Sequence, residues 1–326
     1  MAALSSPSQT SQSANRRMHP FTHSPTPVGR EAFSTGSLRL DLAMRTGGVL
    51  PGEMVEICGD EGSGKTTLCQ HILAAAQRLG KTCAWIDADL SLDSNFARRC
   101  GVDLSELYLA TPTDINQTLD ILETLAASGA FDLIVVDSLT SWLPYRAYIR
   151  ESSSQGAPSE EKLISLTLRR LAPIVTHQAL TILVTHRLRP KSPIAYHKLA
   201  AHLARLSLKL HATLQLTLRA GQLIERDGVI IGQQVQARLS RREIAPCWHS
   251  IEFDIIYEQG IVKIGEVFDL GIALGELLLQ NGVYSLRGIE LGSGREAAML
   301  ALQRHALLET LEQVIRRKLL RTAALR

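Results

Sequence analysis

The clearest chemistry in the sequence lies in a glycine-rich segment that can bind phosphate groups. The segment has the form G-x-x-x-x-G-K-[ST], and it consists of Gly59, Asp60, Glu61, Gly62, Ser63, Gly64, Lys65, Thr66 and Thr67. In such a loop the backbone N–H groups converge on phosphate oxygens, the lysine reaches the β- and γ-phosphates, and the hydroxyl holds Mg²⁺. Lys65 and Thr66 are therefore the predicted phosphate and metal ligands of a nucleotide site.

The segments on either side of this loop have the patterns that a working phosphate loop requires. Residues 54–58 form an apolar run that predicts a buried strand, and residues 65–79 predict a helix that ends at Gly80. The N-terminus of such a helix adds a partial positive charge where the phosphates would bind. The alternative is a glycine-rich turn without a ligand, and the strand–loop–helix context argues against it.

Carboxylates at the ends of two further predicted strands could complete the site. Asp137 ends an apolar strand, where a second acid beside the Mg²⁺ ion belongs, and capping of a following helix is the alternative. Asp87, Asp89 and Asp93 end or follow a strand over residues 82–87, so we expect all three to face the same crevice. One of them could position a water molecule for attack on the γ-phosphate, and ordinary turn or cap roles are the alternative.

The order of the predicted elements indicates an α/β fold. Continuous apolar strands alternate with helices, which is typical of a parallel sheet that helices cover on both faces. The strands are predicted over residues 54–58, 82–87, 131–137 and 180–185, and the helices over residues 65–79, 115–128 and 160–177. Beyond residue 210 the pattern changes to alternating segments that predict antiparallel strands. These cover residues 211–219, 229–239 and 250–257, with turn signals at Asp227-Gly228 and Gln259-Gly260.

We divide the chain of 326 residues into three parts. Residues 1–32 are rich in Ser, Pro, Thr and Gln, and we expect them to form a disordered tail. Residues 33–264 are predicted to form the main α/β core. Residues 265–326 are predicted to form a small C-terminal subdomain that ends in a long basic helix over about 295–320.

The composition is ordinary for a soluble globular protein. The chain is 45% hydrophobic and 21% charged, and its net charge of +3 is a weak hint of an acidic partner. Its five cysteines show no C-x-x-C spacing, which predicts free thiols in a reducing cytosol. No apolar run approaches about 18 residues, and the N-terminus lacks the apolar segment of a secretory signal. We therefore expect a cytoplasmic protein without a membrane partner.

Longer matching strings make the chain similar to the bacterial RecA recombinases from residue 34 to about residue 304. The strings cover residues 34–38, 59–67, 74–78, 80–84, 86–88, 101–103, 134–138, 265–266, 269–271 and Gly292. The resemblance implies a RecA-like P-loop NTPase core with a small C-terminal α/β subdomain. It also implies a Mg²⁺-dependent, DNA-dependent ATPase that uses ATP and binds single-stranded DNA in homologous recombination and DNA repair.

The resemblance further implies roles for individual residues around the nucleotide. Asp137 would hold Mg²⁺ through water, and Asp93 would hydrogen-bond the adenine. Phe96 stands where the family has an aromatic ring that packs on the base, and an ordinary core phenylalanine is the alternative. Tyr257 matches a position near the nucleotide of the neighbouring subunit.

Four positions depart from the family pattern. The catalytic glutamate falls at Asp89, whose carboxylate is drawn back by one methylene, about 1.5 Å, and a misplacement of this order can lower a rate about 10²-fold. The glutamine that senses the γ-phosphate falls at Arg187, which could grip that phosphate as an arginine in cis does in some NTPases, or could have lost the switch. Two lysines that reach across the subunit interface fall at Arg241, which keeps the charge, and Glu243, which reverses it.

Two segments correspond to the DNA-contacting loops of the family. The first, residues 150–159, is polar and carries little positive charge. The second, residues 188–205, has the expected length and lacks the usual glycines. Phosphate contact and base stacking are predicted there and just beyond, through Arg189, Lys191, Tyr196, Lys198, Arg205 and Lys209. The alternative is an amphipathic helix that packs on the core.

Both ends of the chain also differ from the family. The N-terminal helix and strand that the family docks onto the next subunit are missing, so the resemblance allows a filament or other homo-oligomer while the docking segment is lacking. The C-terminal end carries a basic run, which is typical of a solvated helix face, with DNA contact as the alternative. The run contains Arg316, Arg317, Lys318, Arg321 and Arg326.

Two functional hypotheses follow. The first is ATP-dependent binding of single-stranded DNA in recombination and repair, in which ATP orders the segment after Arg187. The second is a diverged relative that acts as a regulatory or accessory binding module, with weak hydrolysis and no strand exchange. Asp89, Arg187, Glu243 and the missing N-terminal helix favour the second hypothesis, whereas the matches around the phosphate loop and Asp137 favour a working ATP site.

Overall fold

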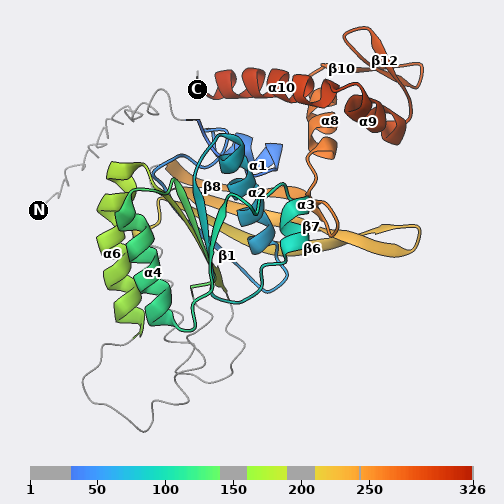
Figure 1. Cartoon of the computed structure of the whole chain (residues 1–326). Coiled ribbons are helices and arrows are strands. Elements are labelled where there is room, and N and C mark those ends of the chain that lie inside the picture. The colour runs from blue at the N-terminus through green and yellow to red at the C-terminus, as the bar shows by residue number, and fades with distance from the viewer. Residues whose placement is uncertain (1–30, 140–159, 189–209, 242–243, 325–326) are drawn as a thin grey trace, which may run out of the picture.

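The computed structural model describes residues 31–139, 160–188, 210–241 and 244–324 of the chain. Figure 1 shows a central sheet with helices on both faces and a further unit built from the C-terminal residues. In the described part of the chain, no helix combines the length and the apolar character needed to cross a membrane.

Within these residues, nine strands form one sheet in the order β3-β2-β4-β5-β1-β6-β7-β8-β9. The strands are β1 (Met54–Gly59), β2 (Cys83–Asp87), β3 (Leu107–Ala110), β4 (Leu133–Asp137), β5 (Thr181–Arg187), β6 (Leu214–Arg226), β7 (Val229–Arg241), β8 (Ile244–Ile256) and β9 (Gly260–Ile261). Neighbours from β3 to β6 pair in parallel, and neighbours from β6 to β9 pair antiparallel. The predicted fold class, a mostly parallel sheet with an antiparallel extension, is confirmed.

Two hydrophobic cores hold helices against opposite faces of the sheet. The helices of this part are α1 (Leu38–Ala43), α2 (Lys65–Arg78), α3 (Ser94–Arg99), α4 (Ile115–Ser128) and α6 (Glu160–Gln178). On one face, Val55 of β1 shares a core with Leu68 of α2. On the other face, Ile182 of β5 shares a core with Leu122 of α4 and Leu168 of α6. Every residue of β1, β2 and β4 is buried, as expected for parallel strands between two layers of helices.

The sequence analysis did not predict β3 and α3. In β3, Tyr108 and Leu109 are exposed, so the strand lies at the sheet edge and lacks a continuous buried run. In α3, Ala97 is the buried residue, so the helix lacks the apolar stripe that makes a helix visible in a sequence.

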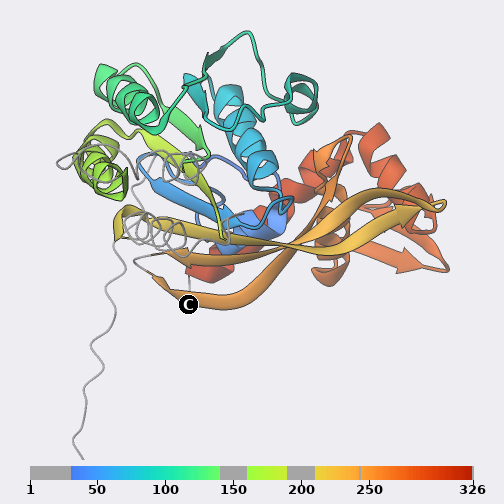
Figure 2. The same cartoon turned by 90° about the horizontal axis from the view of Figure 1, so that it is seen from below.

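A long hairpin of β6 and β7 extends from the body of the molecule, as Figures 1 and 2 show. Its turn is formed by Asp227 and Gly228, whose φ angles are 53° and 77°. Positive φ at both central positions is typical of the two-residue turns that match the twist of paired strands. The predicted turn is confirmed, and the hairpin joins the antiparallel extension to β1 through β6.

The C-terminal residues form a unit with a hydrophobic core of its own. It contains α8 (Ile264–Ala273), α9 (Arg295–Arg304), α10 (Leu307–Ala324) and a three-stranded antiparallel sheet of β10 (Leu277–Gln280), β11 (Val283–Leu286) and β12 (Ile289–Ser293). The single helix predicted over about 295–320 is wrong. Ala306 has a φ of 53°, which ends α9 and turns the chain, so that Leu302 and Leu311 both pack against Phe268 in this core.

Helix α1 connects this unit to the rest of the molecule. Glu266 of α8 accepts hydrogen bonds from Ser37 Oγ at 3.1 Å and from the Arg39 N–H at 2.8 Å. Arg316 of α10 donates to Asp41 Oδ2 at 2.6 Å. The predicted domain limits stay a prediction, because these bonds cross the proposed boundary.

We expect Glu266→Gln to change how the free energy of unfolding depends on pH. Burial raises the pKa of Glu266 from an ordinary 4.5 to about 7. The wild type therefore loses stability as the pH rises from about 4.5 to about 7, because the unfolded carboxyl ionises while the folded one stays protonated. Glutamine keeps an acceptor for Ser37 and Arg39 and does not ionise. The variant should gain about 3 kcal/mol on the wild type between acidic and alkaline pH.

Urea unfolding near pH 5 and near pH 8 measures this change. Glu290→Gln is the matched control, because Glu290 is exposed on β12 and its substitution should leave the pH dependence as it is. Equal stability differences between Glu266→Gln and the wild type at both pH values would contradict the prediction.

Candidate nucleotide-binding site

The phosphate loop joins the end of β1 to the start of α2, and two of its glycines allow a close approach to other strands. A Cβ atom on Gly59 would lie 2.3 Å from Ser63 Oγ and 2.6 Å from the carbonyl oxygen of Leu218. Gly64 has a φ of 88°, and a Cβ atom there would lie 2.5 Å from Ile255 Cδ1. Side chains at either position would force a rearrangement, so the loop depends on glycine where it meets β6 and β8.

Two side chains of the loop fit a phosphate ligand. Ser63 Oγ is buried and has no hydrogen-bond partner among the described residues, which is rare for a buried hydroxyl. Lys65 Nζ donates to the carbonyl oxygens of Gly59 at 3.1 Å and Asp60 at 2.8 Å, which leaves a third N–H for a ligand. Burial lowers the pKa of Lys65, and the nearby carboxylate of Asp137 opposes that change.

Asp137, at the end of β4, joins several parts of the site. Its carboxylate accepts hydrogen bonds from Thr66 Oγ1 of α2, at 2.6 Å, and from Thr185 Oγ1 of β5. Its backbone carbonyl accepts the N–H groups of Ala88 at 2.8 Å and Asp89 at 3.3 Å. Burial raises the pKa of Asp137, and the two threonine bonds lower it. A hydroxyl and a carboxylate side by side are oxygen ligands of the kind that Mg²⁺ prefers.

Two of the three acids after β2 have local structural roles. Asp87 is buried, and its carboxylate accepts the N–H groups of Ser91 and Leu92. Asp93 is exposed and caps α3, and the hydrogen bond from the Phe96 N–H is the main cause of its lowered pKa. The turn and cap roles left open by the sequence therefore exist at these two positions. The adenine contact of Asp93 stays a prediction.

Arg187, at the end of β5, lies between the phosphate loop and the third acid. Its Nη1 is 3.7 Å from Glu61 Oε2, and its Nη2 is 3.6 Å from Asp89 Oδ2. The side chains of Arg187 and Glu61 are 30% and 63% exposed. Long, solvent-exposed ion pairs of this kind contribute about 0–1 kcal/mol, so the guanidinium can exchange carboxylates for a phosphate at low cost.

A pocket of about 300 Å³ lies beside the loop. It is lined by Gly62, Gly64, Lys65, Thr66, Thr67, Phe96, Gln233, Ile255 and Tyr257. Phe96 is partly exposed, which fits a pocket wall better than a core position. Gln233 and Ile255 were not predicted. The alternation in β8 indicates that Ile255 faces the core, but no sequence signal places β7 and β8 against the phosphate loop.

Arg241 is not among the residues that line this pocket. It lies at the far end of β7, opposite Leu214, whereas Gln233 of the same strand borders the pocket. Its Nη1 is 3.1 Å from Glu53 Oε1, and both side chains are largely buried. The contact that the resemblance implies with a neighbouring chain would require this ion pair to break.

The other predicted positions lie outside the described residues. These are Arg189, Lys191, Tyr196, Lys198, Arg205, Lys209, Glu243 and the residues 150–159. The residues that follow Leu139 are also undescribed, so the alternative role of Asp137 as a helix cap is not tested.

Known proteins with similar sequences agree with this geometry. Residues 23–262 match the family profile of the RecA N-terminal domain. The chain is 37% identical over 277 residues to protein RecA of Bartonella bacilliformis, 38% over 282 residues to that of Bartonella quintana, and 36% over 288 residues to that of Rhodospirillum centenum. These alignments cover 85–88% of this chain and 80–81% of the relatives. The resemblance seen in the sequence is confirmed, and the chain belongs to the RecA family.

Proposed function

We propose that the chain binds single-stranded DNA in an ATP-dependent manner in recombination and DNA repair, and that it hydrolyses ATP with Mg²⁺. The observation that carries the proposal is the position of Arg187. This residue contacts Glu61 of the phosphate loop and Asp89, and it directly precedes the segment 188–205 that is expected to contact DNA. A change at the nucleotide therefore has a direct path to that segment.

The surroundings of the loop support a role for each nucleotide ligand. Lys65 and the loop N–H groups would bind the β- and γ-phosphates, and Thr66 with Asp137 would hold Mg²⁺, which stabilises negative charge on the phosphates. Phe96 and Tyr257 border the pocket and would pack against the base. Asp93 would meet the adenine from the start of α3.

Asp89 would orient the attacking water. Its backbone N–H is bonded to the Asp137 carbonyl oxygen, which limits how far the chain can move to compensate for the shorter side chain. Arg187 would leave Asp89 when it meets the γ-phosphate. We therefore expect slow hydrolysis that is linked to the movement of Arg187.

An accessory binding module without strand exchange is the second candidate. The observation that favours it is the buried Arg241–Glu53 pair, which holds in its own chain an arginine expected to reach a neighbouring subunit. A filament or other homo-oligomer belongs to the first candidate. The DNA measurements described below separate the two.

Lys65→Ala should weaken binding of ATP with Mg²⁺ roughly 10- to 100-fold, because it removes a charged hydrogen-bond donor to the phosphates. Isothermal titration calorimetry measures the affinity. Lys81→Ala is the matched control, because Lys81 pairs with Asp132 outside the site, and its removal should leave the affinity unchanged. Equal affinities of Lys65→Ala and the wild type would refute the assignment of the loop.

Asp89→Glu should raise the ATPase rate, because it restores the missing methylene, and Asp89→Asn should lower the rate below that of the wild type. Steady-state phosphate release gives the rates, and calorimetry checks that ATP affinity is retained. The water-positioning role of Asp89 is wrong if Asp89→Asn hydrolyses ATP as fast as the wild type.

Binding to single-stranded DNA should require ATP and should weaken steeply with salt, because phosphate contacts release counterions. Lys191→Ala and Lys198→Ala should each lower the salt slope by roughly 0.7, and Tyr196→Ala should cost about 1–3 kcal/mol of stacking. Fluorescence anisotropy at several salt concentrations measures these effects, with Lys81→Ala as the control. An affinity that ignores ATP, salt and these side chains would favour the accessory module.

A further inference from the structure

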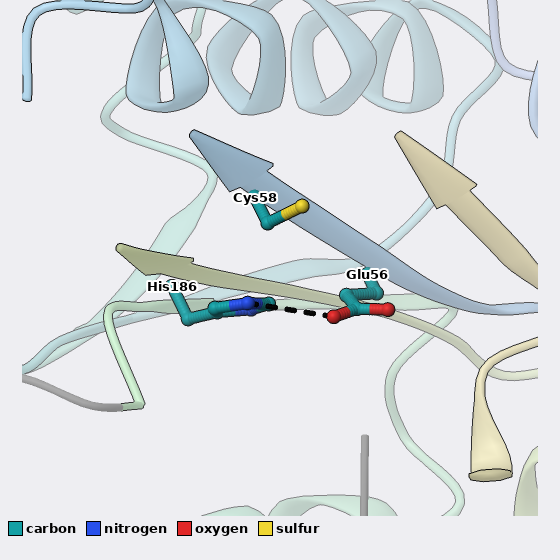
Figure 3. A group of neighbouring side chains, drawn as sticks. All are labelled: Glu56, Cys58 and His186. Atoms are coloured by element: carbon teal, nitrogen blue, oxygen red, sulfur yellow. Dashed lines mark ion pairs between the residues drawn. The ribbon is translucent and has the colours of Figure 1, made fainter. Parts of the chain in front are cut away.

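A second group of side chains with metal-binding chemistry lies inside the sheet, one residue away from the nucleotide site. Glu56 and Cys58 of β1 and His186 of β5 each offer one ligand atom, and these atoms lie within 4.8 Å of one another. Figure 3 shows the three side chains gathered on the same side of the two strands. Their exposed fractions are 3%, 2% and 1%.

The backbone positions these three residues. Alternate residues of a strand share a face, so Glu56 and Cys58 lie on the same face of β1. Cys58 is directly opposite His186 in the parallel register of β1 and β5. Because both strands are in the interior of the sheet, the arrangement does not depend on a flexible loop.

The three donors match the ligand chemistry of zinc. Zinc in proteins is bound by cysteine sulfur, histidine nitrogen and carboxylate oxygen at about 2.0–2.3 Å, so two such donors on a tetrahedral ion lie about 3.3–3.6 Å apart. His186 Nε2 and Glu56 Oε1 are 3.4 Å apart. The hydroxyl of Thr217 on β6 is 3.2 Å from Cys58 Sγ and can donate to a thiolate there, as outer-shell groups of metal sites do.

Burial adds a reason for a cation at this place. A carboxylate and an imidazole are costly to bury unless they are paired, hydrogen-bonded or bound to a metal. An ion held by both strands would satisfy Glu56 and His186 together. The neighbouring residues on this face, Met54 and Ile182, are apolar, so the three polar side chains stand apart from the core around them.

We propose that Glu56, Cys58 and His186 bind one Zn²⁺ ion as a structural site with a water molecule in the fourth position. Cys58 would bind as the thiolate and release its proton to solvent, and His186 would bind through neutral Nε2. The ion would join the end of β1, next to Gly59 of the phosphate loop, to the end of β5, next to Arg187. These donors are distinct from Thr66 and Asp137, so the proposal does not depend on the proposed ATPase.

The metal content of the full-length protein tests this proposal. The protein is purified without chelators in the presence of excess Mg²⁺, which keeps the nucleotide site from taking up zinc, and zinc is measured by elemental analysis. We expect one zinc ion per chain in the wild type and in Cys83→Ala, whose buried thiol lies outside the cluster. Cys58→Ser and His186→Asn should each lose the ion.

Cobalt gives a spectroscopic test that needs no variant. Protein produced with Co²⁺ in place of zinc should show a thiolate-to-cobalt charge-transfer band and the visible bands of a four-coordinate ion. Cys83→Ala should retain these bands and Cys58→Ser should lose the charge-transfer band. Absence of zinc and of the charge-transfer band in the wild type would overturn the proposal even if a variant fails to fold, and so would bands that survive Cys58→Ser.

Discussion

The site depends first on the burial of one carboxylate. Asp137 is 2% exposed, and such a group is costly to bury unless hydrogen bonds compensate it. Thr66 and Thr185 provide those bonds, which ties the start of α2 and the end of β5 to the end of β4. The same residue accepts two N–H groups from the chain after β2 through its backbone carbonyl. Four elements of the nucleotide site are therefore held in register by Asp137.

This constraint gives the substitution at Asp89 its meaning. In a flexible loop, a shorter acid could be compensated by a small shift of the backbone. Here the N–H groups of Ala88 and Asp89 are bonded to Asp137, whose own position is set by β4. The missing methylene therefore acts on the distance between the carboxylate and its target, as positioning arguments require.

Two arginines of the chain are held in opposite ways. Arg187 has two long ion pairs with partly exposed partners, which are weak and easily exchanged. Arg241 has a shorter and largely buried pair with Glu53, and removing one partner of such a pair typically costs about 3–5 kcal/mol. A response to nucleotide within one chain is therefore available through Arg187, whereas any contact of Arg241 with another chain first has to break a buried pair.

The sequence by itself determined the strand–loop–helix around residues 59–67, the apolar strands of the parallel sheet and the turn at Asp227 and Gly228. These features depend on spacing and residue type within a few positions, so local patterns carry them. Family resemblance added the candidates Phe96 and Tyr257, which the fold places at one pocket.

The tertiary structure decided which distant groups meet. It brought Gln233 and Ile255 to the phosphate loop, paired Arg241 with Glu53, ended α9 before Ala306, and placed His186 beside Glu56. Each of these outcomes depends on strand order or helix packing between segments far apart in the chain, and hydrophobic periodicity predicts that a residue is buried without indicating its neighbour.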